Sequence, residues 1–199
     1  MSKKISSFFI SNNIIKEEDK EVYEYSLELL LSTILNFAAV IIIAIFTGKI
    51  LEATLFVLGF VPLRALAGGY HADTHFRCFL ILLFTYSVFL LIIFFIPAKL
   101  VFATAIIIML ISILLIFILA PVENSNRPFS EKERKTLKKK SRIGILVYAA
   151  IVLCLTLLFS NKIFGFSLAF GIFSVSFSLL ASVIRNKLTK TALMRKALK

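Results

Sequence analysis

The chain has 199 residues, of which 59% are hydrophobic and 17% are charged, and its net charge is +12. A soluble domain averages nearer half apolar residues and spreads its charge along the sequence, whereas here long stretches carry no charge at all. The apolar surface therefore faces lipid, and a basic nucleic-acid-binding protein is excluded because the Lys and Arg residues flank the apolar stretches.

The two cysteines, Cys78 and Cys154, stand in unlike surroundings and form no CxxC pair, so a disulfide framework is excluded. Cys154 lies inside an apolar run, and we interpret it as structural. No cleavable signal peptide is visible after Lys3 and Lys4, because a polar and charged stretch soon follows. Residues 1–26 are predicted to form a cytoplasmic or interfacial segment.

Six apolar segments follow in chain order, and each is predicted to be a transmembrane helix. They are residues 27–46, 51–67, 79–96, 100–120, 143–159 and 163–184. Twenty helical residues at about 1.5 Å each reach about 30 Å, the thickness of the hydrocarbon core. The second segment is the weakest, since Glu52, Gly59, Pro62 and Arg64 interrupt it. The fold class expected is an all-α membrane protein with about six transmembrane helices.

The distribution of basic residues predicts the orientation. Residues 121–142 form a strongly basic loop and residues 185–199 a basic tail, whereas the short connections hold one Lys each. Lys and Arg accumulate on the cytoplasmic side, so this loop and both termini are predicted to be cytoplasmic. Because the amino terminus and the basic loop lie on the same side of the membrane, an even number of spans must separate them, so the weak second segment must cross. Residues 1–199 then form one integral membrane domain, multi-pass in the cell membrane, whose basic tail could bind anionic lipid.

The polar residues that could carry chemistry lie almost entirely in residues 64–78, predicted as a loop on the cytoplasmic side. Both histidines, His71 and His75, and one cysteine, Cys78, fall within eight residues. On a helix, positions seven apart share a face, so His71 could reach Cys78. Gly68 and Gly69 permit a sharp turn that would return the loop toward the protein.

A cysteine is nucleophilic only as thiolate, which an adjacent imidazole together with Arg64 or Arg77 would stabilise. A carboxylate would orient the imidazole. Asp73 is the candidate nearest in sequence, and Glu28 is expected at the same membrane depth. On the residues alone a Cys–His dyad, a zinc site of His71, His75 and Cys78, and a non-catalytic loop all stay open.

A wider pattern resembles a known family. It joins Arg64-x3-Gly68-Gly69-x-His71-Ala-x5-Cys78 to Tyr25-Ser-Leu-Glu28 at the start of the first span. Ala120-Pro-Val-Glu-Asn-Ser-Asn-Arg-Pro128 follows the fourth span and precedes the basic stretch. Together these resemble AgrB, the accessory gene regulator B family of Gram-positive quorum-sensing systems, over most of the chain.

The resemblance implies a membrane cysteine endopeptidase without a cofactor. It cleaves a small AgrD-type propeptide with Cys78 as nucleophile and His71 as general base, and the thioester acyl-enzyme closes to a thiolactone or lactone autoinducing peptide. Glu28 falls at a position where the family has a polar residue. His75 lies outside the family's motif, which argues against a metal site. The family also implies a homodimer. The alternative function is that of a peptide transporter, whose helices would carry paired charges within the membrane. Spans three to six show no such paired charges in their middles.

Overall fold

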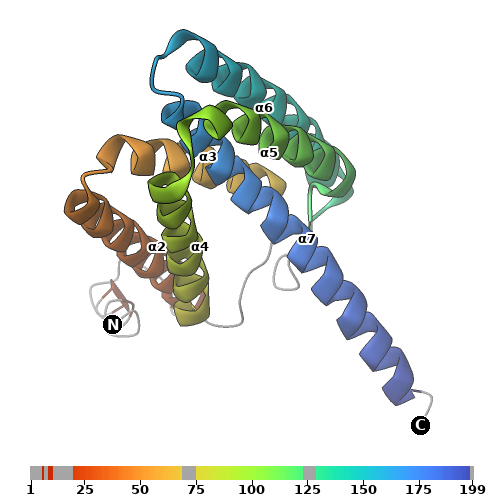
Figure 1. The fold of residues 1–199 in the computed structure, drawn as a ribbon. Coiled ribbons are helices and arrows are strands. Elements are labelled where there is room, and N and C mark those ends of the chain that lie inside the picture. Colours follow the sequence, from red (N-terminus) through yellow and green to blue (C-terminus); the bar gives the residue numbers. More distant parts are fainter. Residues whose placement is uncertain (1–5, 7–8, 11–19, 69–74, 123–128, 198–199) are drawn as a thin grey trace. The chain divides into compact units, whose positions relative to one another are not determined.

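The computed structural model describes residues 6, 9–10, 20–68, 75–122 and 129–197, and the named elements within them are all helices (Figure 1). This confirms the all-α class. The helices are α2 (Lys20–Thr47), α3 (Ile50–Ala67), α4 (His75–Phe95), α5 (Ala98–Leu119), α6 (Glu131–Leu158) and α7 (Ile163–Ala197).

Five of these helices, α3 to α7, are long and apolar enough to cross a membrane. They include the weak second segment, which is the 18-residue helix α3. α2 contains the predicted first span, of which Ile34–Thr47 is a shorter apolar helical stretch. The protein is therefore an all-helical membrane protein, and the first of its six predicted crossings stays a prediction.

The helices extend beyond the predicted spans at their charged ends. Residues 131–142, expected in the basic loop, form the first turns of α6, and α7 continues through the predicted tail to Ala197.

The residue at which α6 begins is determined by local hydrogen bonds. The Ser130 hydroxyl accepts the Glu133 amide at 3.3 Å, and the Glu133 carboxylate accepts the Ser130 amide at 3.0 Å. This capping box satisfies two backbone donors that the helix itself leaves unpaired.

The chain divides into two compact units, which are described separately. The first comprises Met1–Thr47 and Ala72–Ser87, and the second comprises Gly48–His71 and Val88–Lys199, so α4 contributes to both. In the first unit, the Ser6 hydroxyl donates to a carboxylate oxygen of Glu24 at 2.9 Å.

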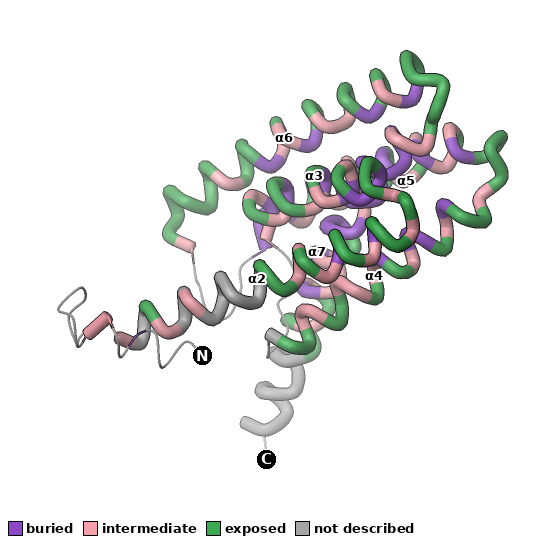
Figure 2. Tube along the Cα trace, turned by 90° about the vertical axis from the view of Figure 1, so that its left-hand side faces the viewer, coloured by how far each residue is buried: buried purple, intermediate pink, exposed green. Residues whose placement is uncertain are grey.

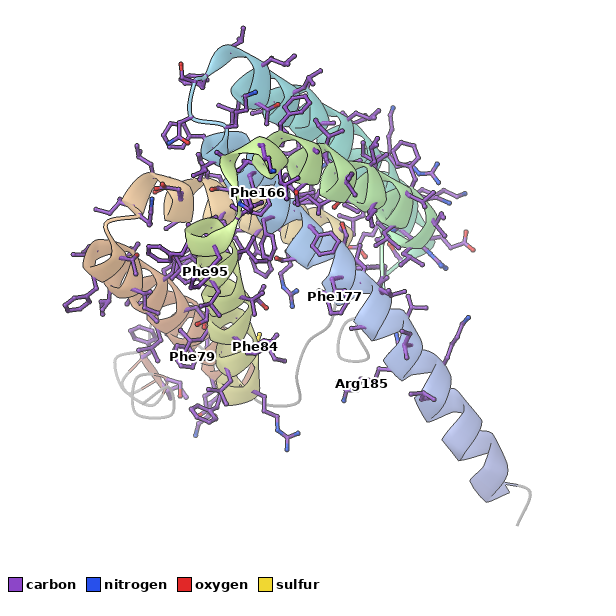
Figure 3. The ribbon with its side chains drawn as sticks, viewed as in Figure 1. Phe79, Phe84, Phe95, Phe166, Phe177 and Arg185 are labelled. Atoms are coloured by element: carbon purple, nitrogen blue, oxygen red, sulfur yellow. The ribbon has the colours of Figure 1, made fainter. Side chains whose placement is uncertain are left out.

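Helix α7 is the centre of the second unit, where it packs against α3, α5 and α6. Within an apolar stretch of 18 residues, 67% of the residues of α7 are buried, against 28% in the corresponding stretch of α5. The buried positions gather where α3 and the first half of α7 meet (Figure 2). Phe166 of α7 lies in this core, whereas Phe177, further along the helix, is 60% exposed (Figure 3).

Aromatic rings fill the core of the second unit. Phe56 of α3 stacks on Phe89 of α4 with ring centroids 5.1 Å apart, and Phe89 contacts Phe170 of α7 at 5.5 Å. Phe166 and Phe170, one helical turn apart, are also in contact at 5.8 Å. Such ring pairs add to the van der Waals packing on which helix association in lipid depends.

Glycines let α3 and α7 approach to backbone contact. A Cβ added at Gly59 would lie 2.5 Å from the Leu168 carbonyl oxygen, and one at Gly171 would collide with the Phe56 carbonyl. Each helix thus supplies a glycine at the point where the other helix crosses it. Small residues at such crossings are typical of membrane helix pairs.

Helix α3 contains Pro62, whose missing amide removes the helical hydrogen bond to the Leu58 carbonyl. The Tyr148 hydroxyl of α6 donates to this carbonyl oxygen at 2.8 Å. In lipid an unsatisfied backbone carbonyl is costly, and neighbouring helices supply the missing donor. Tyr148 therefore accommodates the proline.

We expect Gly171→Ala to destabilise the protein by about 2 kcal/mol or more, because the α3 backbone would have to move. Gly144→Ala is the matched control in α6, where the nearest atom to an added Cβ, from Leu66, is 3.6 Å away. That change should be neutral or stabilising by up to about 1 kcal/mol. Equilibrium unfolding of both variants in mixed micelles would check this, and equal stabilities would contradict the close crossing.

Tyr148→Phe should cost about 1 kcal/mol, since it leaves the Leu58 carbonyl without its donor. In a Pro62→Ala background the same change should cost little, because the substituted alanine would restore the helical amide. A double-mutant cycle of unfolding free energies measures this coupling. Additive effects would show that Tyr148 does not compensate for the proline.

Candidate active site

The predicted loop of residues 64–78 is shorter in the structure, because both of its ends are helical. Arg64 lies in the last turn of α3, and Cys78 lies in the first turn of α4. Cys78 is a half-buried free thiol and belongs to the first unit, whereas Arg64 belongs to the second. α4 therefore holds the cysteine on a helix rather than on a loop.

Several predicted site residues lie outside the described residues. These are Gly69, His71 and Asp73, together with the side chains of Glu28 and His75. Of the helical stripe predicted from His71 to Cys78, α4 includes the positions of His75 and Cys78. The dyad and its orienting carboxylate stay predictions. Among the described residues, no three His, Cys, Asp or Glu side chains gather as a metal site would require.

Arg64 is anchored inside the second unit. Its guanidinium Nη1 donates to the Ser178 hydroxyl of α7 at 2.8 Å and lies over the Phe60 ring, 5.4 Å from the centroid. A cation at the carboxyl end of a helix also interacts favourably with the helix dipole. Arg64 thus joins the carboxyl end of α3 to α7.

Three backbone carbonyls at the end of α3 receive donors, one from the helix's own cap and two from other parts of the unit. The Gly68 amide donates to Arg64 O at 2.9 Å, and the Val122 amide donates to Ala67 O at 3.0 Å. The Ser141 hydroxyl of α6 donates to Leu66 O at 3.0 Å. A helix leaves its last carbonyls without internal donors, so these contacts fix where α3 ends.

Gly68 connects two sequence motifs that lie far apart in the chain. Its φ of 78° is in the left-handed region, and it forms an isolated parallel bridge with Val122. A Cβ at Gly68 would collide with the Val122 carbonyl. The end of α3 at Gly68 and the segment at Val122 therefore dock backbone to backbone, which a side chain larger than hydrogen at Gly68 would prevent.

The start of α6 binds the end of α5 in the same region. Arg142 Nη2 donates to the Phe117 carbonyl at 2.9 Å, and its guanidinium lies over the Phe117 ring at 5.2 Å. The preceding basic side chains of α6 are exposed, and they are Lys132, Arg134, Lys135, Lys138, Lys139 and Lys140. The carboxyl end of α3, the end of α5 and the basic start of α6 thus share one end of the second unit.

Reasoning from the sequence missed Ser141 and Ser178 as contacts of the α3 terminus. Nothing in the local pattern distinguishes them, since each pairs with a residue more than 70 positions away in the chain. The one available signal was Ser130-Glu-Lys-Glu133, which predicts a helix start and so places Ser141 on a helix.

These features define an all-helical membrane protein in which a glycine-ended span leads, through a short segment, to a free cysteine at the start of the next span. The accessory gene regulator B profile matches residues 2–179. The chain belongs to the AgrB family.

Similar proteins carry the same description. A protein of Listeria monocytogenes serotype 4a (strain HCC23), described as AgrB-like, is 31% identical over 159 residues, covering 77% of this chain and 76% of its own. Two AgrB-like proteins of Clostridium perfringens are 29% identical (strain 13) and 28% identical (strain SM101). They cover 85% and 96% of this chain, and 79% and 90% of their own lengths. No solved structure matches the chain.

We expect Gly68→Ala to separate the two docked segments, because it combines a left-handed residue with a collision against Val122. The Val122 amide would lose its acceptor, Ala67 O, and should exchange with solvent at least about tenfold faster. Hydrogen exchange resolved to this amide checks the prediction, with Gly144→Ala as the control substitution. Unchanged protection at Val122 would show that the bridge does not depend on Gly68.

Proposed function

We propose that this protein is a membrane-embedded cysteine endopeptidase that cleaves an AgrD-type propeptide and supports its cyclisation to a quorum-sensing peptide. Membership of the AgrB family carries the proposal. The roles of His71 and Cys78 rest on the resemblance of their motif to that of the family. The half-buried free thiol of Cys78 on the first turn of α4 is compatible with a nucleophile that a substrate can reach.

The proposed reaction begins when the Cys78 sulfur attacks the carbonyl carbon of the scissile peptide bond while His71 accepts the thiol proton. The tetrahedral intermediate collapses, the C–N bond breaks, and His71 returns the proton to the leaving amine. The released product is the carboxyl-terminal part of the propeptide. An acyl thioester remains on Cys78.

Cyclisation requires a nucleophile other than water. A thiol or hydroxyl of the bound propeptide attacks the thioester, loses its proton to His71 and restores the Cys78 thiol. A site at the membrane boundary would exclude water and so favour this internal capture over hydrolysis. Donors for the oxyanion would come from amides that α4 does not use internally, such as those of its first turn. The amide of Phe79 lies four residues after His75, and a regular helix uses such an amide internally.

The basic end of the second unit supports a cytoplasmic site. The exposed lysines of α6 and the carboxyl end of α3 lie together, as the Ser141–Leu66 contact shows. If the positive-inside rule holds for these lysines, the segment that leads to His71 begins at the cytoplasmic face. The same charges would attract an acidic substrate segment and anionic lipid headgroups. The homodimer stays a prediction from the resemblance.

Cys78→Ala and His71→Ala should each abolish propeptide cleavage, because one removes the nucleophile and the other the base. Cys154→Ala is the matched control, since this second free thiol is exposed on the membrane-spanning part of α6. It should retain full activity, and His75→Ala should be tolerated. Mass spectrometry of the purified protein mixed with its cognate propeptide should detect an acyl adduct on Cys78.

The same assay distinguishes the alternatives when it is repeated with a chelator. An adduct on Cys78 that survives chelation supports the thioester mechanism. Activity lost to chelator without any adduct would instead make His71, His75 and Cys78 metal ligands. Normal cleavage by Cys78→Ala would end the proposal, and binding without cleavage by the wild type would favour transport.

A further inference from the structure

The first turns of α6 carry basic charge that increases toward the membrane-spanning part of the helix. The basic side chains among residues 131–140 are all exposed, and they are Lys132, Arg134, Lys135, Lys138, Lys139 and Lys140. The acidic residues of this stretch, Glu131 and Glu133, stand at its start, and the chain contains no Asp or Glu after Glu133. The residues next to the apolar span therefore carry positive charge alone.

Contacts with two neighbouring helices fix how far this basic segment projects from the apolar part of the second unit. Ser141 donates to Leu66 O at the end of α3, and Arg142 donates to Phe117 O near the end of α5. Both of those spans end near these contacts, and the apolar part of α6 begins directly after Arg142. Residues 131–140 therefore lie beyond the apolar layer that the three helices form.

The length of this segment matches the depth over which lipid headgroups act on a charge. From Arg142 to Lys132 a regular helix rises about 15 Å. The headgroup region on one side of a bilayer is about 6 Å thick, and at physiological salt a screened charge acts over about 8 Å more. Long lysine side chains can also bend toward the headgroups. Anionic headgroups can thus attract every basic residue of the segment.

The pattern of charge around α6 also fits lipid better than a peptide. Lys135 and Lys139 are four residues apart, and like charges at this spacing destabilise a helix unless anions lie between them. Residues 131–136 and 138–140 are exposed, so the charges point to every side of the helix. A bound peptide would cover one side, whereas headgroups surround a helix where it leaves the membrane.

We propose that the basic start of α6, residues 131–140, is a binding surface for the headgroups of anionic phospholipids. The lysines at positions 138–140 contact the headgroups, and the acidic residues lie farthest from them. Because Ser141 and Arg142 continue the same helix, bound lipid stabilises the segment that holds the ends of α3 and α5. This inference does not rest on the proposed peptidase activity, since it involves neither of the proposed catalytic residues.

The test compares two classes of lipid on the full-length protein. Native mass spectrometry in a non-ionic detergent measures the dissociation constants for phosphatidylglycerol and phosphatidylcholine. We expect the wild type to prefer phosphatidylglycerol by at least about tenfold, because each lysine near an anionic surface contributes about fivefold. Lys138→Gln, Lys139→Gln and Lys140→Gln together should lower this preference at least about fivefold and preserve the helix, since glutamine is a good helix former. Lys138→Arg, Lys139→Arg and Lys140→Arg together keep the charge and should retain the preference.

Position along the helix supplies the matched control. Lys132 and Lys140 are both exposed, but on a regular helix Lys132 is about 12 Å farther from the apolar span. Lys140→Gln should weaken phosphatidylglycerol binding about fivefold, and Lys132→Gln less than about twofold, because a lipid with its chains along the spans places its phosphate near their ends. Glu131→Lys combined with Lys139→Glu preserves the net charge but brings a carboxylate to the headgroups, so this exchange should lower the preference as well.

The remaining outcomes would overturn the inference. Equal affinities of the wild type for the two lipids, or a preference that the triple glutamine variant keeps, would show that the segment does not bind anionic headgroups. Equal losses in Lys132→Gln and Lys140→Gln would indicate a general attraction rather than contact at the membrane surface. A soluble oligoglutamate peptide that displaces phosphatidylglycerol, and that the charge exchange does not affect, would assign the segment to an acidic peptide instead.

Discussion

The second unit depends on how the backbone carbonyls of α3 are satisfied where water is scarce. Pro62 leaves the Leu58 carbonyl without its helical amide, and the end of the helix leaves Leu66 and Ala67 without theirs. Tyr148, Ser141 and the Val122 amide supply the three donors. In hydrocarbon an unsatisfied carbonyl costs several kcal/mol by general estimates, so the position of α3 is coupled to that of α6 and of the segment before it.

This coupling explains why α6 begins well outside its apolar span. The capping box at Ser130 and the following lysine-rich turns extend the helix toward Ser141 and Arg142. These two residues then bind the ends of α3 and α5, respectively. The same helical segment carries its lysines exposed, so one stretch of sequence provides both a structural contact and a basic surface. A flexible loop of equal charge could attract an acidic partner but could not hold α3.

The sequence predicted the spans of α3 to α7 well because long uncharged runs have few alternatives in lipid. It predicted helix ends poorly at α6 and α7, where charged residues were assigned to loops although lysine and glutamate are good helix formers. The contact between Gly68 and Val122 could not be predicted, since a backbone bridge between distant segments leaves no periodic pattern. The Gly-Gly motif predicts a sharp turn after α3, but not the segment that Gly68 approaches. For His71 and Cys78 the motif remains the source of the assignment, and the structure adds the helical setting of the cysteine.

Neighbouring helices explain how α3 can span the membrane despite its low hydropathy. Three of the residues that lower it have partners in the second unit: Gly59 meets the Leu168 carbonyl, Pro62 is compensated by Tyr148, and Arg64 bonds Ser178. A helix that faces only lipid would gain nothing from these residues, since glycine and proline weaken it and arginine is costly there. α3 tolerates them because α6 and α7 pack against it. A span embedded in this way can end in a glycine and pass directly into a polar segment, because its last carbonyls have donors in neighbouring elements.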